Sequence, residues 1–429
     1  MKRIFYKDKT AIDALLKDNK NLGNKEQFEI VSTILDDIKL NGYEAVRKYT
    51  EKFDGINLDE SQFRVSEEEI EEAMSYVDAD FIEAITLAIE NVEKFHKKQM
   101  LETTLEESED GVILGQLIRP VARVGLYVPG GTAAYPSSVV MTAVPAKVAG
   151  VKDIIMISPP DSNGRMNPYT LAAARLSGVS NIYKVGGAQG IGVLAYGAGD
   201  LKKVDKIVGP GNIYVTIAKK IVYGTVDIDM LAGPSEILVI ADDKAKPAYI
   251  AADLLSQGEH DKLASSILVT FSEKQANLIE NEVEKQLKML TREDIARTSI
   301  ENNGAIIIAD TIEDGIEFSN AYGPEHLELA IEEPFKWLDS IENAGAVFLG
   351  YYTPEPIGDY FAGPNHVLPT NGTSRFYSPL NTHTYLKKTS VISYTREAIL
   401  KKGKYIEKLA SVEGFTAHKN SITVRLKDE

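Results

Sequence analysis

The 429-residue chain contains no cysteine. It therefore has no disulfide bond, no thiolate metal ligand and no cysteine nucleophile, so any metal site must use nitrogen and oxygen ligands. Positive charge is also in short supply, because 63 acidic residues outnumber 47 basic ones and the formal net charge is −16. Such a charge repels a nucleic acid backbone and an anionic membrane surface. We therefore expect no nucleic acid and no membrane among the partners.

Long apolar runs are absent as well. No segment approaches the length of a membrane span, and Asp13 and Lys17 interrupt the N-terminal region before it reaches the apolar length of a signal peptide. We expect a cytoplasmic protein. With 44% hydrophobic and 26% charged residues, the composition is that of an ordinary globular protein, and the length predicts more than one domain.

The order of apolar patterns predicts an α/β fold. Residues 1 to about 120 are charged, with apolar positions mostly at helical spacing. From Val121 onward, short β-rich runs alternate with helical runs, and a second series of the same kind begins at SEILVIAD. Such alternation is typical of parallel βαβ units. We predict two Rossmann-like open sheets that lack GxGxxG, with small N-terminal and C-terminal helical appendages.

Glycine-rich turns follow the strands of the first series, in PGGTAAYP, VGGAQG and GPGN. Such turns expose main-chain N–H groups at helix N-termini, where the phosphates of a dinucleotide bind. The segment Gly125 to Thr132 has the glycine spacing of a P-loop but carries Gly131 where the lysine belongs, so a nucleoside triphosphatase is not supported. Two interpretations remain: the turns bind a dinucleotide, or they only permit tight connections.

Gln257 and His260 lie three residues apart at the end of an apolar helix-like run, a spacing that places both side chains on one helical face. Asp359 and His418 offer two more ligands of types that a borderline metal accepts, and no cysteine competes with them. An N/O-ligated zinc site is the natural interpretation. The alternative is a histidine that only makes a hydrogen bond at a helix end.

Glu325 and His326 are neighbours in a predicted turn, where both side chains can point into one cleft. A Glu–His pair suits general acid–base work, because histidine titrates near neutrality and glutamate can activate a water molecule. The alternative is a surface charge pair. Among the other histidines, we expect His96 to be solvated, His366 to brace a loop and His383 to have no chemical role.

Several long motifs occur in order along the chain. They are VGLYVPGGTAAYPSS, VGGAQG, KIVGPGN, VDIDMLAGPSEILVIAD, DLLSQGEHD, AYGPEHLEL, GPNHVLPTNG and EGFTAH. With these motifs, over essentially its full length, the chain resembles the histidinol dehydrogenase family. The resemblance implies a four-electron oxidation of L-histidinol to L-histidine through L-histidinaldehyde, the last steps of histidine biosynthesis, with two NAD+ in succession, one zinc ion per subunit and a homodimer.

The resemblance also implies roles for individual residues. The implied zinc ligands are Gln257, His260, Asp359 and His418, which also surround the substrate. Glu325 and His326 would form the acid–base pair, with His326 also touching the substrate. The implied NAD contacts are Tyr127, Gln189 and Asn212, and the further substrate contacts are Ser235 and Glu413. The C-terminal segment would reach across the dimer, so that Glu413 and His418 would complete the neighbouring subunit's site.

We expect four parts in the chain. They are an N-terminal helical appendage at 1–22, a larger α/β domain formed by 23–126 and 237–379, an inserted NAD-binding Rossmann-like domain at 127–236, and a C-terminal tail domain at 380–429. The larger domain would carry most of the metal and acid–base residues. The tail domain would reach the partner subunit.

The missing cysteine agrees with one mechanism of aldehyde oxidation and excludes another. A thiolate cannot attack the carbonyl here, but an activated water molecule can hydrate the aldehyde to a gem-diol. In that scheme His326 takes the hydroxyl proton, Glu325 deprotonates the attacking water, and zinc mainly positions the substrate. Two rival hypotheses are a zinc-dependent hydrolase that uses no nucleotide, against which the glycine turns argue, and a non-catalytic, nucleotide-sensing relative.

Overall fold

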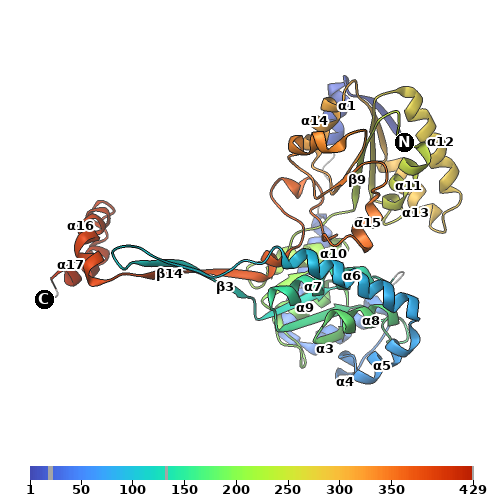
Figure 1. Ribbon diagram of the computed structural model, residues 1–429. Helices are drawn as coiled ribbons and strands as arrows, with labels where there is room; N and C mark the ends of the chain where they lie inside the picture. Colours follow the sequence, from blue (N-terminus) through green and yellow to red (C-terminus); the bar gives the residue numbers. More distant parts are fainter. Residues whose placement is uncertain (18–22, 131–133, 428–429) are drawn as a thin grey trace. The chain divides into compact units, whose positions relative to one another are not determined.

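The computed structural model describes residues 1–17, 23–130 and 134–427 (Figure 1). The chain forms two compact units, one made of Met1–Gln99 with Ala122–Tyr385 and the other of Met100–Val121 with Leu386–Glu429. The first unit contains two parallel sheets and the second an antiparallel sheet followed by two helices. Among the described helices, none combines the length and apolarity that a membrane crossing demands.

The five-stranded sheet of the first unit has the order β6-β5-β4-β7-β8, and all its neighbouring strands are parallel. Its strands are β4 (Arg123–Tyr127), β5 (Asp153–Ser158), β6 (Asn181–Lys184), β7 (Lys206–Val208) and β8 (Asp227–Ile228). The connecting helices are α7 (Pro136–Ala149), α8 (Pro168–Ser177), α9 (Gly187–Tyr196) and α10 (Ile213–Val222). The chain direction across the sheet reverses between β4 and β7, which opens a crevice at the carboxyl ends of the strands.

The six-stranded sheet has the order β1-β11-β10-β9-β12-β13, again with parallel neighbours. Its strands are β1 (Lys2–Phe5), β9 (Glu236–Ala241), β10 (Ser265–Thr270), β11 (Ala305–Ile308), β12 (His326–Ala330) and β13 (Ala346–Leu349). Its helices are α1 (Lys9–Lys17), α11 (Pro247–Gly258), α12 (Glu273–Leu287), α13 (Glu293–Asn303), α14 (Ile312–Tyr322) and α15 (Glu355–Tyr360), with 3₁₀ turns η1 (Pro334–Ser340), η2 (Thr373–Arg375) and η3 (Thr382–Tyr385). Without β1, the order repeats that of the five-stranded sheet, so the prediction of two Rossmann-like sheets is confirmed.

Both central strands of the six-stranded sheet are buried along their whole length. Every residue of β9 and β10 is buried, because one apolar cluster packs on each face of the sheet. Continuous apolar runs such as EILVIA and SSILVT are typical of parallel strands covered by helices on both sides. Glu236 and His326, the first residues of β9 and β12, are buried polar residues at one edge of this core.

In the described part of the chain, five helices follow α1 and precede the first strand of the five-stranded sheet: α2 (Lys25–Asn41), α3 (Tyr43–Asp54), α4 (Glu60–Phe63), α5 (Glu67–Tyr76) and α6 (Ala79–Lys97). A capping box between Asn24 and Gln27 begins α2. The apolar face of α2 shares one core with α9 and α10. A Cβ atom on Gly192 of α9 would lie 2.8 Å from Cδ1 of Ile38, so this glycine permits the close approach of the two helices.

The observed packing adds two facts to the expected division of the chain, which stays a prediction. Because α2 and α3 bury their apolar faces against α9, the first part of 23–126 packs with the five-stranded sheet and not only with 237–379. The expected helical appendage at 1–22 contains a strand, since Lys2–Phe5 pairs with β11 as the edge of the six-stranded sheet. The residues at 18–22 of that segment lie outside the described residues.

The second unit contains β2 (Thr104–Glu107), β3 (Ile113–Pro120) and β14 (Leu386–Ser393), in the antiparallel order β14-β3-β2. Helices α16 (Arg396–Val412) and α17 (Thr416–Leu426) follow (Figure 1). Helices α2 to α6 agree with the expectation of mostly helical structure up to residue 120, and α16 and α17 agree with the expected helical tail, but neither expectation included the strands β2, β3 and β14. The reason is that β3 and β14 are far apart in sequence, so neither segment alone reveals its pairing partner.

Candidate metal centre and acid–base pair

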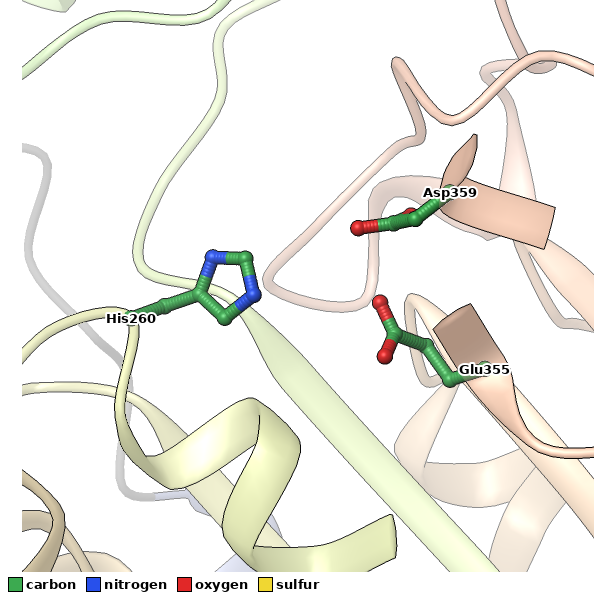
Figure 2. Close-up of side chains that lie close together, drawn as sticks. All are labelled: His260, Glu355 and Asp359. Carbon is green, nitrogen blue, oxygen red and sulfur yellow. The ribbon is translucent and has the colours of Figure 1, made fainter. Parts of the chain in front are cut away.

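Three ligand-type side chains point toward one another in the lobe of the six-stranded sheet (Figure 2). His260 lies in the turn after α11, and Glu355 and Asp359 are four residues apart on α15. The spacing of four places both carboxylates on one face of the helix. One ligand atom from each of the three residues lies within 4.8 Å of the others. An imidazole and two carboxylates form a donor set that zinc accepts.

Gln257 lies in the last turn of α11 and is 1% exposed. Its Oε1 atom is buried and has no hydrogen-bond partner among the described residues. A buried amide oxygen without a partner is unfavourable by a few kcal/mol, so a bound cation or donor would satisfy it. Because α11 ends at Gly258, His260 reaches the site from the following turn, where its N–H donates to the carbonyl of Gln257 at 3.2 Å, and not from the helix itself.

Glu355 is a site residue that the sequence analysis missed, although its spacing of four from Asp359 was a usable signal. Its side chain is 2% exposed. Ser256 Oγ donates to its Oε2 at 3.3 Å, and its main-chain N–H donates to Glu328 Oε1 at 2.8 Å. Burial, followed by the neighbouring Asp359 charge, raises the pKa of Glu355, and burial also raises the pKa of Asp359. Two crowded, buried carboxyl groups favour a cation between them.

Glu325 and His326 lie where α14 turns into β12 and His326 is the first residue of that strand. Gly323 makes the turn possible, because it has φ +65° and a Cβ atom there would lie 2.9 Å from Ser374 Oγ. Both side chains bind the main chain of Glu236. The N–H of Glu236 donates to Glu325 Oε2 at 2.8 Å, and its carbonyl lies 3.0 Å from His326 Nδ1. Since a carbonyl only accepts, Nδ1 carries the hydrogen and Nε2 is left with a free lone pair.

The free Nε2 atom of His326 faces the carboxylates of Glu355 and Asp359 in the candidate metal site. It lies 3.9 Å from Glu355 Oε1 and 3.9 Å from Asp359 Oδ1, and it has no hydrogen-bond partner. Burial lowers the pKa of His326 to about 3 and raises the pKa of Glu325 well above its usual range. The side chains of His326 and Glu325 are only 5% and 9% exposed, so they are not a surface charge pair.

Two other histidines differ in their surroundings. His366, expected to brace a loop, binds the carbonyl of Asp359 through Nδ1 at 3.0 Å, and the same nitrogen lies 3.7 Å from Asp359 Oδ1. His366 therefore contacts Asp359, one of the three candidate metal ligands. The expectation that His96 is solvated is wrong, because it is fully buried and binds the Val92 carbonyl at 2.8 Å. Its charged neighbours lie on the outer face of α6, whereas position 96 falls on the apolar face with Val92.

Two of the expected NAD contacts lie at the carboxyl edge of the five-stranded sheet. Tyr127 is the last residue of β4, and its hydroxyl accepts the N–H of Gly187 at 3.2 Å. Gln189 lies in the first turn of α9 and donates through Nε2 to Asp54 Oδ2 at 3.3 Å. Burial raises the pKa of Asp54 to about 6. No signal in the sequence links Asp54 to Gln189, because only the packing of α3 against α9 joins them.

Asn212, the third expected NAD contact, is the N-cap of α10. Its Oδ1 accepts the N–H groups of Tyr214 at 3.0 Å and Val215 at 3.2 Å. The amide oxygen is therefore committed to the helix, and only Nδ2 is available to a ligand. The sequence analysis identified Asn212 as an NAD contact but did not predict that its Oδ1 atom caps the helix.

The turn that presents Asn212 is sterically restricted and internally braced. Gly209 has φ +114°, and a Cβ atom there would lie 2.2 Å from the carbonyl oxygen of Tyr127, so only glycine fits. The main chain of Gly209 is held by a buried ion pair, because its carbonyl accepts Lys219 Nζ at 3.0 Å and its N–H donates to Asp229 at 2.7 Å. The turn is thus a preformed element.

A cavity of about 490 Å³ lies at the carboxyl ends of β4 and β5, between residues of α5 and α8. Gly130, Ser158 and Pro159 line it on the sheet side, and Glu69 lines it from α5. Residues 131–133, part of the expected PGGTAAYP turn, lie outside the described residues. The remaining glycines of these turns approach neighbouring atoms closely, since a Cβ atom on Gly130 would lie 2.9 Å from Pro159.

The remaining expected substrate contacts lie in different places. Ser235 directly precedes β9, next to the acid–base pair. Glu413 and His418 belong to the second unit, where Glu413 caps the end of α16 and His418 lies in the first turn of α17. Both are exposed, and neither is part of the group formed by His260, Glu355 and Asp359. Their assigned roles stay predictions.

Comparisons with known proteins identify the family of this chain. The histidinol dehydrogenase family model matches residues 17–426. The histidinol dehydrogenase of Heliobacterium mobile is 55% identical over 397 residues, covering 92% of this chain and 93% of that protein, and that of Listeria monocytogenes is 52% identical over 415 residues, covering 96% of each. The crystal structure of histidinol dehydrogenase from Elizabethkingia anophelis superposes with a TM-score of 0.94 at 42% identity, covering 100% of this chain and 98% of that one. These matches favour a dehydrogenase over a nucleotide-free hydrolase, and the chain belongs to the histidinol dehydrogenase family.

Proposed function

We propose that this chain oxidises L-histidinol to L-histidine through L-histidinaldehyde, using one zinc ion per subunit and two NAD+ in succession. The observation that carries the proposal is the free Nε2 of neutral His326, which faces a group of metal-type ligands. The chemistry balances as two two-electron oxidations. The alcohol loses a hydride and a proton, the aldehyde adds water, and the gem-diol loses a second hydride and proton.

The residues present fit a zinc ion. His260, Asp359 and Glu355 bring nitrogen and oxygen donors within 4.8 Å of one another, and the Oε1 atom of Gln257 is buried without a partner. We assign Gln257, His260 and Asp359 as zinc ligands in the same subunit, with His418 as the fourth. When bound, zinc would hold the substrate and polarise it as a Lewis acid. His366 would keep Asp359 oriented through the Asp359 carbonyl.

The acid–base pair supplies the proton transfers. Neutral His326 can accept the hydroxyl proton at Nε2, because Nδ1–H is already held by the Glu236 carbonyl. Glu325 can take the proton of the attacking water, since its raised pKa makes its carboxylate a stronger base than an exposed glutamate. Burial of both side chains excludes bulk water from the reacting atoms. We also propose that Ser235, directly before β9, contacts the substrate.

The carboxyl edge of the five-stranded sheet fits a dinucleotide. Tyr127, Gln189 and Asn212 lie at or after the carboxyl ends of β4, β6 and β7, and the strand order of this sheet reverses between β4 and β7. Gly209 in one turn has no room for a side chain, which is the property of a turn that a phosphate approaches closely. When bound there, NAD+ would accept the hydride in each oxidation.

We further propose a cytoplasmic homodimer in which the second unit completes the partner's site. Glu413 and His418 are both exposed. Around them, α16 and α17 expose large apolar side chains: Leu400, Tyr405, Ile406, Leu409, Val412, Phe415 and Val424. An exposed apolar surface of this kind is typical of a subunit interface.

The central test is the yield of NADH from limiting L-histidinol with excess NAD+. Two equivalents would establish the four-electron reaction, whereas one equivalent would mean that the aldehyde is released and that the role of Glu325 is wrong. Glu325→Gln should slow the oxidation of supplied L-histidinaldehyde by about 100-fold or more, and that of L-histidinol less. The exposed Glu332→Gln is a matched control that should leave both rates unchanged. Equal losses in both half-reactions of the Glu325 variant would contradict the assignment.

Subunit exchange tests the role of the tail. Glu325→Gln and His418→Ala are each expected to be nearly inactive as homodimers. In a mixed dimer, one site combines an intact Glu325 with an intact tail from the other subunit, so activity should return on mixing. If His418 served its own subunit, every site of the mixed dimer would carry one lesion and activity would stay absent.

A further inference from the structure

Glu236 is a buried acidic residue beside the acid–base pair, and none of the steps above uses its side chain. It is 1% exposed and is the first residue of β9, whose other five residues are all apolar. An apolar residue would suit this position equally well by burial alone. A buried carboxylate is retained only where hydrogen bonds compensate for lost hydration.

The carboxylate of Glu236 joins three separate segments of the chain. Its Oε1 accepts the hydroxyl of Tyr322 at 3.4 Å, and its Oε2 accepts the main-chain N–H of Asn371 at 3.2 Å. Tyr322 is the last residue of α14, three positions before Glu325. The side chain therefore ties the start of β9 to the segment that carries the acid–base pair.

The main chain of Glu236 forms hydrogen bonds with both Glu325 and His326. Its N–H donates to Glu325 Oε2 at 2.8 Å, and its carbonyl accepts His326 Nδ1–H at 3.0 Å. These two contacts choose the tautomer of His326 and orient the carboxylate of Glu325. A shift of this single peptide segment would misplace the acid and the base together.

The segment before Glu236 is held mainly through its main chain: the N–H of Ser265 donates to the Ser235 carbonyl at 3.0 Å, and Thr216 Oγ1 donates to the Ala232 carbonyl at 2.9 Å. Gly233 packs directly on the Asn371 side chain, where a Cβ atom would lie 2.0 Å from Nδ2, and its N–H donates to Thr370 Oγ1 at 2.6 Å. Asn371 itself has φ +55°. The loop at 370–371 thus braces the 233–236 segment from one side, and the Glu236 carboxylate is the connection to α14 on the other.

We propose that Glu236 is the positioning residue of the reaction, whose carboxylate anchors the main chain that holds Glu325 and His326. The proposal rests on the acid–base roles assigned above. The wild-type NADH yield and Glu325→Gln are measured in parallel, so that failure of those roles is seen independently of any Glu236 variant.

The first test separates kcat from KM. Glu236→Ala should lower kcat by about 100-fold, since misplacement near 1 Å costs about that much, while KM for histidinol and NAD+ stays within about threefold. Glu236→Gln should stay within about fivefold of wild type, because the amide oxygen can accept from Asn371 and the amide N–H can donate to the Tyr322 hydroxyl. Loss of activity in the Gln variant equal to that in the Ala variant would overturn the proposal.

The second test asks whether Glu236 acts through the pair. With Glu325→Gln or His326→Asn already present, Glu236→Ala should cost less than about tenfold, because part of what it positions is gone. A loss of about 100-fold in every background would show that Glu236 supports the fold and not the pair.

A milder variant covers the case in which Glu236→Ala fails to fold. Tyr322→Phe removes one hydrogen bond to the carboxylate and should lower kcat by about three- to tenfold. Ser319→Ala removes a buried hydroxyl without a hydrogen-bond partner from the same helix and is the matched control, expected within about twofold of wild type. Equal kcat values for the two variants would refute the role of the Tyr322–Glu236 contact.

Discussion

The buried ion pair beneath the Gly209 turn allows a prediction that links stability to cofactor binding. The side chains of Lys219 and Asp229 are 3% and 1% exposed, and they form an ion pair. Lys219 Nζ also donates to the Gly209 carbonyl at 3.0 Å, and the Asp229 carboxylate accepts the N–H of Gly209 at 2.7 Å and of Met230 at 2.6 Å. The pair therefore fixes both polar groups of the Gly209 main chain.

Replacing Lys219 by Met would keep the length of the side chain but leave the Asp229 charge buried without its partner. Removing one member of a buried pair costs about 3–5 kcal/mol. The carboxylate keeps its two main-chain N–H donors, so we expect the lower end of that range, about 3 kcal/mol. In the double variant Lys219→Met/Asp229→Asn no uncompensated charge remains and the amide oxygen still accepts an N–H, so the loss should fall to about 1–2 kcal/mol.

The assay is urea unfolding followed by circular dichroism, with amide hydrogen exchange of α10 as a local readout of the same domain. The KM for NAD+ should rise in the Lys219 variant, because the turn that presents Asn212 loses its brace, while KM for histidinol stays the same. A loss below about 1 kcal/mol would refute the argument from buried charge. So would a double variant less stable than the single one.

Three further outcomes follow from the same structure. Burial raises the pKa of Asp54 from 3.8 to about 6, so ionisation of Asp54 disfavours the folded state increasingly from about pH 4 to pH 6. Asp54→Asn should therefore raise the free energy of unfolding by about 1–2 kcal/mol at pH 8 and leave it unchanged at pH 4. Equal effects of this substitution at both pH values would contradict the argument. His260→Asn should weaken zinc binding by about 100-fold in equilibrium dialysis, and unchanged retention would remove it from the ligand set. Gly209→Ala should cost more than about 2 kcal/mol in urea unfolding because its Cβ would meet the Tyr127 carbonyl, whereas Gly224→Ala, with φ +99° and nothing within 4 Å, should cost about 1 kcal/mol.

Much of the fold followed from local patterns. The alternation of β-rich and helical runs after Val121 predicted two parallel sheets, because continuous apolar strands and amphipathic helices differ in period. The strands β3 and β14 were missed for the opposite reason. Their residues pair with a segment far away in the chain, and each is partly exposed, so neither carries a strong local signal.

The candidate site was predictable where its chemistry lies within one motif. The motifs SQGEH and GPEH predicted Gln257, His260, Glu325 and His326 as site residues, because metal ligands and acid–base groups require particular residue types. Glu355 was missed although it lies one helical turn from Asp359. In an acidic protein, one more carboxylate in the sequence does not by itself indicate a metal site. The solvated state expected for His96 was wrong because its charged neighbours in sequence lie on the other face of α6.

The sequence by itself determined the family, the ligand types and the exclusion of thiol chemistry, because these depend on which residues are present and in what order. Only the tertiary structure decided which groups meet. The tautomer of His326, the placement of Glu355 and the role inferred for Glu236 all depend on contacts across some 90 residues of chain or more, or on helix ends. Burial then sets their charge states, since loss of water shifts the pKa of Glu325 and His326 in opposite directions.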